Sequence, residues 1–169
     1  MLDPDLAKGV CMRTNTWVPL ALVVLAIPAL GRMTFAEDNN VGTWKLNLAK
    51  SKYSPGPAPK SQTLKLEAAG DGVKYTADGV GPDGKPTHQE FTAKYDGKDY
   101  AFKGNPDADT ISYKRVDPNT VEAVTKKGGK TTITAKVVVS ADGKTRTLTM
   151  TGKDAQGRDV NNTVVYDKQ

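Results

Sequence analysis

Apolar and polar residues alternate in short runs from Gly42 to the end of the chain, and turn residues separate the runs. The separators are mostly Asp-Gly or Gly-Gly pairs, at the intervals expected of consecutive hairpins. Glycine and aspartate tolerate the positive φ that both central residues of a tight hairpin turn require. The pairs therefore predict an antiparallel meander, and they stand at 71–72, 83–84, 96–97, 128–129 and 142–143.

The alternating runs predict about ten strands, and no run has a helical period. They are rich in Thr and Val, which suit a pleated, half-buried surface. Continuous hairpins favour an all-β, up-and-down meander closed into a barrel, because a sandwich needs longer connections and an open sheet leaves edges that aggregate. The predicted strands are 42–48, 62–68, 73–77, 87–95, 99–103, 110–116, 121–127, 131–140, 146–151 and 159–166.

The first predicted strand is followed by a proline-rich connection. On the strand, Trp44, Leu46 and Leu48 share one face. Segment 54–59 has proline at every second position, which excludes a helix or an internal strand. We expect an extended connection there.

The first 36 residues have a pattern of their own. Lys8 and Arg13 come before an apolar run, 17–30, and Ala36 ends the segment that follows it. A basic start, a short apolar stretch and a small residue before a polar segment are typical of a secretory signal peptide. We expect 1–36 to be removed and 37–169 to be an exported domain, periplasmic or secreted, with no membrane span. The alternatives are a true start at Met12 and a retained membrane anchor.

Cysteine content and charge narrow the function classes. The single cysteine, Cys11, comes before the apolar run, whereas a lipoprotein signal needs its cysteine after that run. The exported domain would therefore fold without a disulfide. The formal net charge is +5, but the lysines are dispersed among Thr and apolar residues, as on solvated strand faces. Without a basic cluster among aromatic residues, nucleic-acid binding is not expected.

Two short motifs stand at the ends of the meander, Gly42-Thr43-Trp44 and the segment 164–168. The first resembles the Gly-x-Trp opening of the calycin superfamily, the lipocalins and fatty-acid-binding proteins. The second is similar to the last strand of the fatty-acid-binding proteins. The resemblance implies a lipocalin-like barrel, as in small exported bacterial proteins of this type. Trp44 would then be structural, closing one end of the barrel with a partner for its indole N–H.

The chain departs from the fatty-acid-binding proteins in two places. Their two-helix lid follows the first strand, where this chain has its proline-rich segment, so no such lid is expected. Their last strand carries Arg-x-Tyr, which holds a fatty-acid carboxylate; here Val164 replaces the arginine and Tyr166 remains. Each lost charge-assisted hydrogen bond is worth about 1.5–3 kcal/mol. Arg115 and Arg146 are candidate replacements. Arg158 is the candidate for the late arginine that covers the tryptophan in lipocalins.

Aromatic residues on the inner faces are the candidate ligand-binding residues. Small-molecule sites are mostly apolar pockets with a few polar groups, and alanines on the same faces leave room beside the rings. The same rings would also serve to fill a solid core. The candidates are Tyr75, Tyr100, Phe102, Tyr113 and Tyr166.

Catalytic, metal and cofactor sites are not predicted. His88 is the only histidine, it stands on a solvated face, and no nucleophile elbow accompanies it. One histidine without a cysteine in the domain excludes a His–Cys metal site. Asn105, Asp107 and Asp109 alternate as calcium ligands do, but the EF-hand frame fails at its glycine and glutamate positions. A turn with solvated acids is the preferred interpretation.

These observations lead to two hypotheses for a monomeric, non-enzymatic protein. The first is binding of a small apolar or amphipathic ligand inside the barrel. The alternative is a structural or interaction protein of the cell envelope with a filled core, whose lysine-rich faces or proline-rich segment contact a partner. The short turns leave little loop for catalysis, so the interior is where we expect function.

Overall fold

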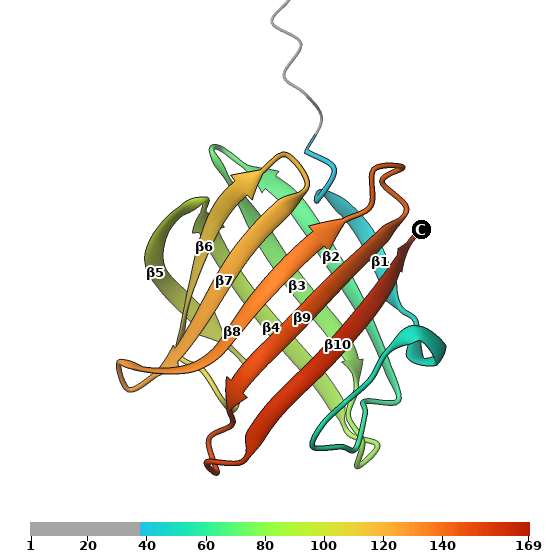
Figure 1. Ribbon diagram of the computed structural model, residues 1–169, viewed down its shortest axis with the longest axis vertical. Helices are drawn as coiled ribbons and strands as arrows, with labels where there is room; N and C mark the ends of the chain where they lie inside the picture. The colour runs from blue at the N-terminus through green and yellow to red at the C-terminus, as the bar shows by residue number, and fades with distance from the viewer. Residues whose placement is uncertain (1–37) are drawn as a thin grey trace, which may run out of the picture. The chain divides into compact units, whose positions relative to one another are not determined.

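The computed structural model describes residues 38–169, which form a closed antiparallel barrel (Figure 1). Each strand pairs with its neighbours in sequence, and β1 pairs with β10 to close the ring. The predicted all-β meander and its closure are confirmed. The strands are β1 (Gly42–Leu46), β2 (Ser61–Ala69), β3 (Gly72–Val80), β4 (Pro86–Lys94), β5 (Asp96–Lys103), β6 (Thr110–Asp117), β7 (Thr120–Lys127), β8 (Lys130–Val139), β9 (Thr145–Lys153) and β10 (Asp159–Lys168).

The alternation in the sequence becomes an inside and an outside of the barrel wall. In β8 every second residue from Ile133 to Val139 is buried, and the residues between them are mostly exposed. Side chains on a strand point alternately to opposite faces, so one apolar set fills the interior. Leu64 and Leu66 on β2 are 0% and 1% exposed. Full burial of such a side chain contributes about 1.5–3 kcal/mol.

The end of the first strand was predicted wrongly. β1 stops at Leu46, and Leu48 begins a short 3-10 helix, η1 (Leu48–Lys50), where it is 44% exposed. Leu48 therefore does not share the inner face with Trp44. The physical reason is local capping, because the Asn47 side chain accepts a hydrogen bond from the Lys50 backbone N–H at 3.1 Å and turns the chain out of the strand.

One turn lies one position away from its prediction. β2 ends at Ala69 and β3 begins at Gly72, so Gly70 and Asp71 form the turn, with Gly70 at φ +60°. Gly72 is instead a strand residue pressed against β4, where an added Cβ would lie 2.1 Å from the Ala93 carbonyl oxygen. The glycine is required there for close approach of two backbones, not for turn geometry.

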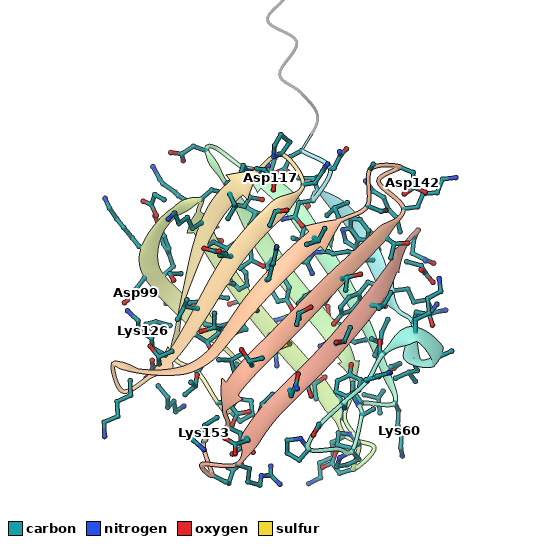
Figure 2. All side chains as sticks on the ribbon, viewed as in Figure 1. Lys60, Asp99, Asp117, Lys126, Asp142 and Lys153 are labelled. Atoms are coloured by element: carbon teal, nitrogen blue, oxygen red, sulfur yellow. The ribbon has the colours of Figure 1, made fainter. Side chains whose placement is uncertain are left out.

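The barrel has two ends that differ in how they are closed. Residues 38–40 and the β6–β7 and β8–β9 turns lie at one end, called here the plug end. Lys60 and the β9–β10 turn lie at the other, called here the far end. Figure 2 labels Asp117 and Asp142 at the plug end, and Lys60 and Lys153 at the far end. The two ends of the barrel interior are therefore not equivalent.

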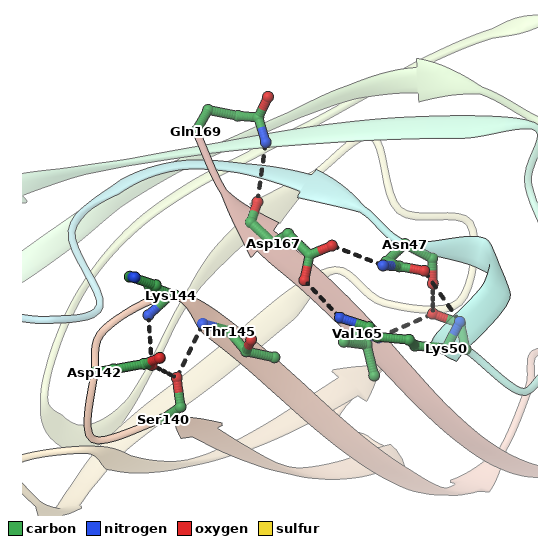
Figure 3. Close-up of polar contacts among 10 residues, drawn as sticks. Asn47, Lys50, Ser140, Asp142, Lys144, Thr145, Val165, Asp167 and Gln169 are labelled. Carbon is green, nitrogen blue, oxygen red and sulfur yellow. Dashed lines mark hydrogen bonds and ion pairs between the residues drawn. The ribbon is translucent and has the colours of Figure 1, made fainter.

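The seam between the first and last strands is held by side chains as well as by ladder hydrogen bonds. Asp167 on β10 accepts from the Asn47 amide at 2.7 Å and from Lys50 Nζ at 3.4 Å (Figure 3). Beyond the short β1, Lys52 forms an antiparallel bridge with Thr163 and continues the wall along β10. The connection 47–60 therefore completes the wall that β1 leaves unfinished.

The predicted signal peptide, 1–36, lies outside the described residues. Among residues 38–169, no helix has the length and apolar character needed to cross a membrane.

Candidate functional site

Three of the five candidate rings come together inside the barrel, and Phe91 connects them. Phe91 stacks on Tyr75, with centroids 4.6 Å apart and planes 12° from parallel. It meets Phe102 edge-on at 5.3 Å and Tyr113 at 5.2 Å. Such offset and edge-to-face contacts stabilise a core by about 0.5–1.5 kcal/mol per pair beyond area burial.

The other two candidates lie apart from this cluster. Tyr100 is opposite Ile111 on the barrel wall, but its hydroxyl donates to Asp96 at 3.0 Å near the protein surface. Tyr166 is 4% exposed, and its hydroxyl donates to the side-chain oxygen of Gln62. Neither ring is in stacking contact with Phe91 or with the three rings around it. The five candidates are thus not one constellation.

Some inward-facing apolar residues keep accessible surface, although most of the residues opposite them are buried. Residues opposite each other on paired strands point to the same face. Three of these partly accessible residues are Tyr75, Leu148 and Met150. Their buried partners, at most 8% exposed, are Leu66, Phe91, Val137, Val164 and Ala135.

Close packing would cover all members of one inner face alike. The partial exposure of Tyr75, Leu148 and Met150 therefore shows that neighbouring side chains leave part of their apolar surface uncovered. Burial nevertheless raises the pKa of the Tyr75 hydroxyl, with Tyr113 adding to the rise and Arg146 opposing it. The Tyr75 side chain is thus partly accessible, although protein encloses its hydroxyl group.

The plug end is closed by Trp44 and Asn40. Trp44 is 0% exposed, and its indole N–H donates to the backbone oxygen of Asn40 at 3.1 Å. Asn40 is 3% exposed, and its amide group donates to the Tyr95 hydroxyl at 3.1 Å. Lys168 places its ammonium 5.2 Å from the centre of the Trp44 ring, within cation–π range. Residue 40, outside every strand, thus organises this end of the interior.

A fully buried arginine lies beside this plug. Arg146 on β9 is 0% exposed. Its Nε donates to the Asn40 side-chain oxygen at 3.0 Å, and its Nη2 donates to the Tyr113 hydroxyl at 3.3 Å. Its Nη1 is buried and has no hydrogen-bond partner. Both acceptors are neutral, and the guanidinium forms no ion pair within residues 38–169.

The other two arginines considered from the sequence have surface roles. Arg115 pairs with Asp38 and lies 3.9 Å from the centre of the Tyr95 ring, at the rim of the plug end. Arg158 pairs with Asp154 at the β9–β10 turn, at the far end and with a 60% exposed side chain. The expectation that Arg158 covers Trp44 is therefore wrong. The late arginine that lies near Trp44 through Asn40 is Arg146.

The oxygen side chains of the β5–β6 loop hold backbone groups of other turns. Asp107 accepts from the Ala155 N–H at 2.9 Å, and Asp109 accepts from the Gly128 N–H at 2.8 Å. They fasten Ala108, which is 3% exposed, against the core at the far end. These acceptor roles explain the alternating acids without a cation.

His88 also has a surface role. Its Nδ1 lies 2.7 Å from Asp78 on the neighbouring strand, and both side chains are more than half exposed. Within the described part of the chain, no three His, Cys, Asp or Glu side chains are grouped as metal ligands would be.

Two hollows lie on the outside of the barrel. One, of about 410 Å³, crosses the seam of β1, β2 and β10 beside η1, and Lys45, Leu48 and Asp167 are among its lining residues. The other, of about 260 Å³, lies at β4 and β5, which pair at only two positions, and reaches Phe91. None of the five candidate rings lines either hollow.

Comparison with known proteins adds little to this geometry. No family model matches the chain, and no curated protein matches it. Among solved structures, zebrafish ileal bile acid-binding protein, crystallised with cholic acid, is similar over 78% of this chain and 99% of its own, at 15% identity and a TM-score of 0.39. A likeness at this level carries no argument about the ligand. The ten-stranded closed meander is itself the architecture that the calycin resemblance implies.

The sequence interpretation named Arg146 as a candidate cation, but it did not place Phe91 and Asn40 with it in one interior. Arg146 alternates with Leu148 and Met150, so the two-residue period places it inside the barrel, and that signal was available. Phe91 lies two residues before Ala93 on the same strand, so the same period also places Phe91 on the inner face. Asn40 had no signal, because it lies outside the strands and acts through tertiary contacts alone.

Proposed function

We propose that this protein is an exported, non-catalytic binding module that holds a small apolar or amphipathic molecule inside its barrel. The observation that carries the proposal is the accessible inner surface of Tyr75, Leu148 and Met150. Ligand sites of this kind are apolar, concave and mostly preformed. The four-ring cluster around Phe91 supplies one rigid wall.

Export is supported by the N-terminal sequence. Lys8 and Arg13, the apolar run 17–30 and the small residue Ala36 follow the order of a secretory signal peptide. The domain after Ala36 has no cysteine, so its folding does not depend on the redox state of the compartment.

Titration with dodecanol by isothermal calorimetry tests the binding proposal. Leu148→Trp replaces the leucine by a larger, aromatic side chain on the inner face, and Thr149→Trp places the same side chain at the adjacent exposed position. We expect dodecanol to bind the wild type and Thr149→Trp alike, and Leu148→Trp at least tenfold more weakly. Circular dichroism confirms that each variant is folded, and Met150→Phe is the milder substitute. No binding to the wild type, or equal binding to both tryptophan variants, would contradict the proposal.

The second candidate is an envelope interaction protein with a filled core. The hollow of about 410 Å³ across the seam favours it, since the exposed Leu48 lies beside Lys45 there. Crosslinking in the envelope through a photoreactive residue at position 48 tests this candidate. Failure to capture a protein or polymer there would count strongly against it.

A further inference from the structure

Asn161 differs from the other asparagines of residues 38–169, because its side chain forms no hydrogen bond with this part of the chain. It lies on the last strand, β10, and its side chain is exposed. The amide groups of the others hold a turn, a cap or a neighbouring segment, so the fold uses them and leaves the Asn161 amide free. The asparagines held in this way are Asn39, Asn40, Asn47, Asn105, Asn119 and Asn162.

Asn161 also begins the one Asn-x-Thr sequence of the chain, Asn161-Asn162-Thr163. An asparagine two residues before Ser or Thr, with no proline between them, is the acceptor for N-linked glycosylation in exported proteins. Asp159 stands two residues before Asn161, at the position where bacterial oligosaccharyltransferases require an acidic side chain. The sequence motif and the free amide therefore select the same residue independently.

We infer that Asn161 is a site of N-linked glycosylation, modified during export and before β10 joins the barrel. The inference rests on the export that we propose above, and it goes beyond the proposed ligand binding. The donor is an oligosaccharide linked to a polyprenyl diphosphate. A bond forms between Asn161 Nδ2 and C1 of the first sugar, and the amide loses one proton to a base of the enzyme. The bond from C1 to the diphosphate oxygen breaks, and the diphosphate leaves with its electron pair.

The strand position of Asn161 sets the order of modification and folding. Its backbone N–H donates to the Ser54 carbonyl oxygen at 2.6 Å, and on its other side the residue is paired with Thr151 of β9. Both edges of β10 are therefore occupied around Asn161 in the folded barrel. An enzyme that has to surround the asparagine and the threonine reaches this segment only before these pairings form.

The folded barrel accommodates a sugar at Asn161 on its outer face. Side chains alternate along β10, so Asn161 and Thr163 point outward, whereas the buried Val164 and Tyr166 set the inner parity. The neighbouring outward residues of β9 are uncharged threonines with hydroxyl groups that suit contact with a sugar. A glycan at Asn161 therefore leaves the interior undisturbed. The same glycan at Asn162 would break its 2.7 Å hydrogen bond from the Ser54 N–H.

The experiment produces the full chain, with its own N-terminal segment, in a bacterial host that has a bacterial oligosaccharyltransferase and its lipid-linked oligosaccharide. Intact-mass spectrometry of the purified protein reports removal of residues 1–36 and addition of the sugar in one measurement. The variants are Asn161→Gln, Thr163→Val and the control Asn162→Gln. Thr163→Val keeps the shape of the side chain and removes only the hydroxyl. Asn162→Gln changes the residue between them and keeps the Asn-x-Thr spacing.

We expect the wild type and Asn162→Gln to lose the N-terminal segment and to gain the mass of one oligosaccharide, which peptide mapping places at residue 161. Asn161→Gln and Thr163→Val should be processed in the same way and show the mass of the bare domain. A processed but bare wild type would overturn the inference and leave export standing. An unprocessed and bare wild type would overturn both. A sugar that persists in Asn161→Gln or in Thr163→Val would also overturn the inference.

Discussion

Replacing Arg146 by methionine tests what a fully buried, unpaired guanidinium contributes to the stability of the barrel. The substitution removes two hydrogen bonds from a charged donor, to Asn40 and Tyr113. Such bonds contribute about 1.5–3 kcal/mol each, or about 3–6 kcal/mol together. Against this, a buried ion has an effective desolvation penalty of several kcal/mol, which methionine does not have. The two effects nearly cancel, so we expect the free energy of unfolding to change by less than about 2 kcal/mol.

Urea unfolding followed by circular dichroism measures this change from the midpoint, provided that the slope is unchanged. Lys153→Met is the control on the same strand, because Lys153 forms an exposed ion pair with Asp159 whose loss costs at most about 1 kcal/mol. A loss above about 4 kcal/mol in Arg146→Met alone would refute the reasoning. The hydrogen bonds from Arg146 to Asn40 and Tyr113 would then outweigh the desolvation of the guanidinium.

Three further predictions concern the barrel itself. Gly152→Ala should lower the free energy of unfolding by more than about 2 kcal/mol, because at φ +146° the added Cβ would lie 2.0 Å from a β8 carbonyl oxygen. The control Gly157→Ala, where the added Cβ meets open space, should cost about 1 kcal/mol. Equal unfolding midpoints of the two variants in urea would contradict this prediction. Leu64→Ala should cost about 2–5 kcal/mol in the same assay, because Leu64 is 0% exposed, and a loss under 1 kcal/mol would show a loosely packed interior. Burial raises the pKa of Tyr53 and Tyr95 to about 12. The free energy of unfolding should therefore be unaffected below pH 10 and fall between pH 10 and 12, because the tyrosines ionise first in the unfolded chain. Tyr53→Phe should make this fall with pH less steep, and an unchanged pH dependence would contradict the assignment.

The strands were predictable because their signal is local. Alternation over eight or so residues fixes which side of the wall each side chain faces, and the Gly128-Gly129 hairpin has both residues at positive φ, as its sequence predicts. One failure came where a side chain redirected the backbone. Leu48 continued the alternating pattern, but the Asn47 cap began a 3-10 helix and turned Leu48 outward.

The interior was only partly predictable, because it depends on which strands meet across the barrel. The parity of Tyr75, Phe102 and Tyr113 was read correctly from single strands. Their contacts through Phe91 depend on the register of four strands, which no single run specifies. The bond between Asn40 and Arg146 joins residues 106 positions apart. Such pairings depend on the closed fold.

The central claim is that a small amphipathic molecule lies inside the barrel along β9. Isotope-filtered nuclear Overhauser spectroscopy with labelled protein and unlabelled dodecanoate measures this most directly. We predict contacts from the ligand methylenes to the side chains of Tyr75, Leu148 and Met150. Contacts confined to Leu48 and the outer seam, or no contacts at saturating ligand, would contradict the account.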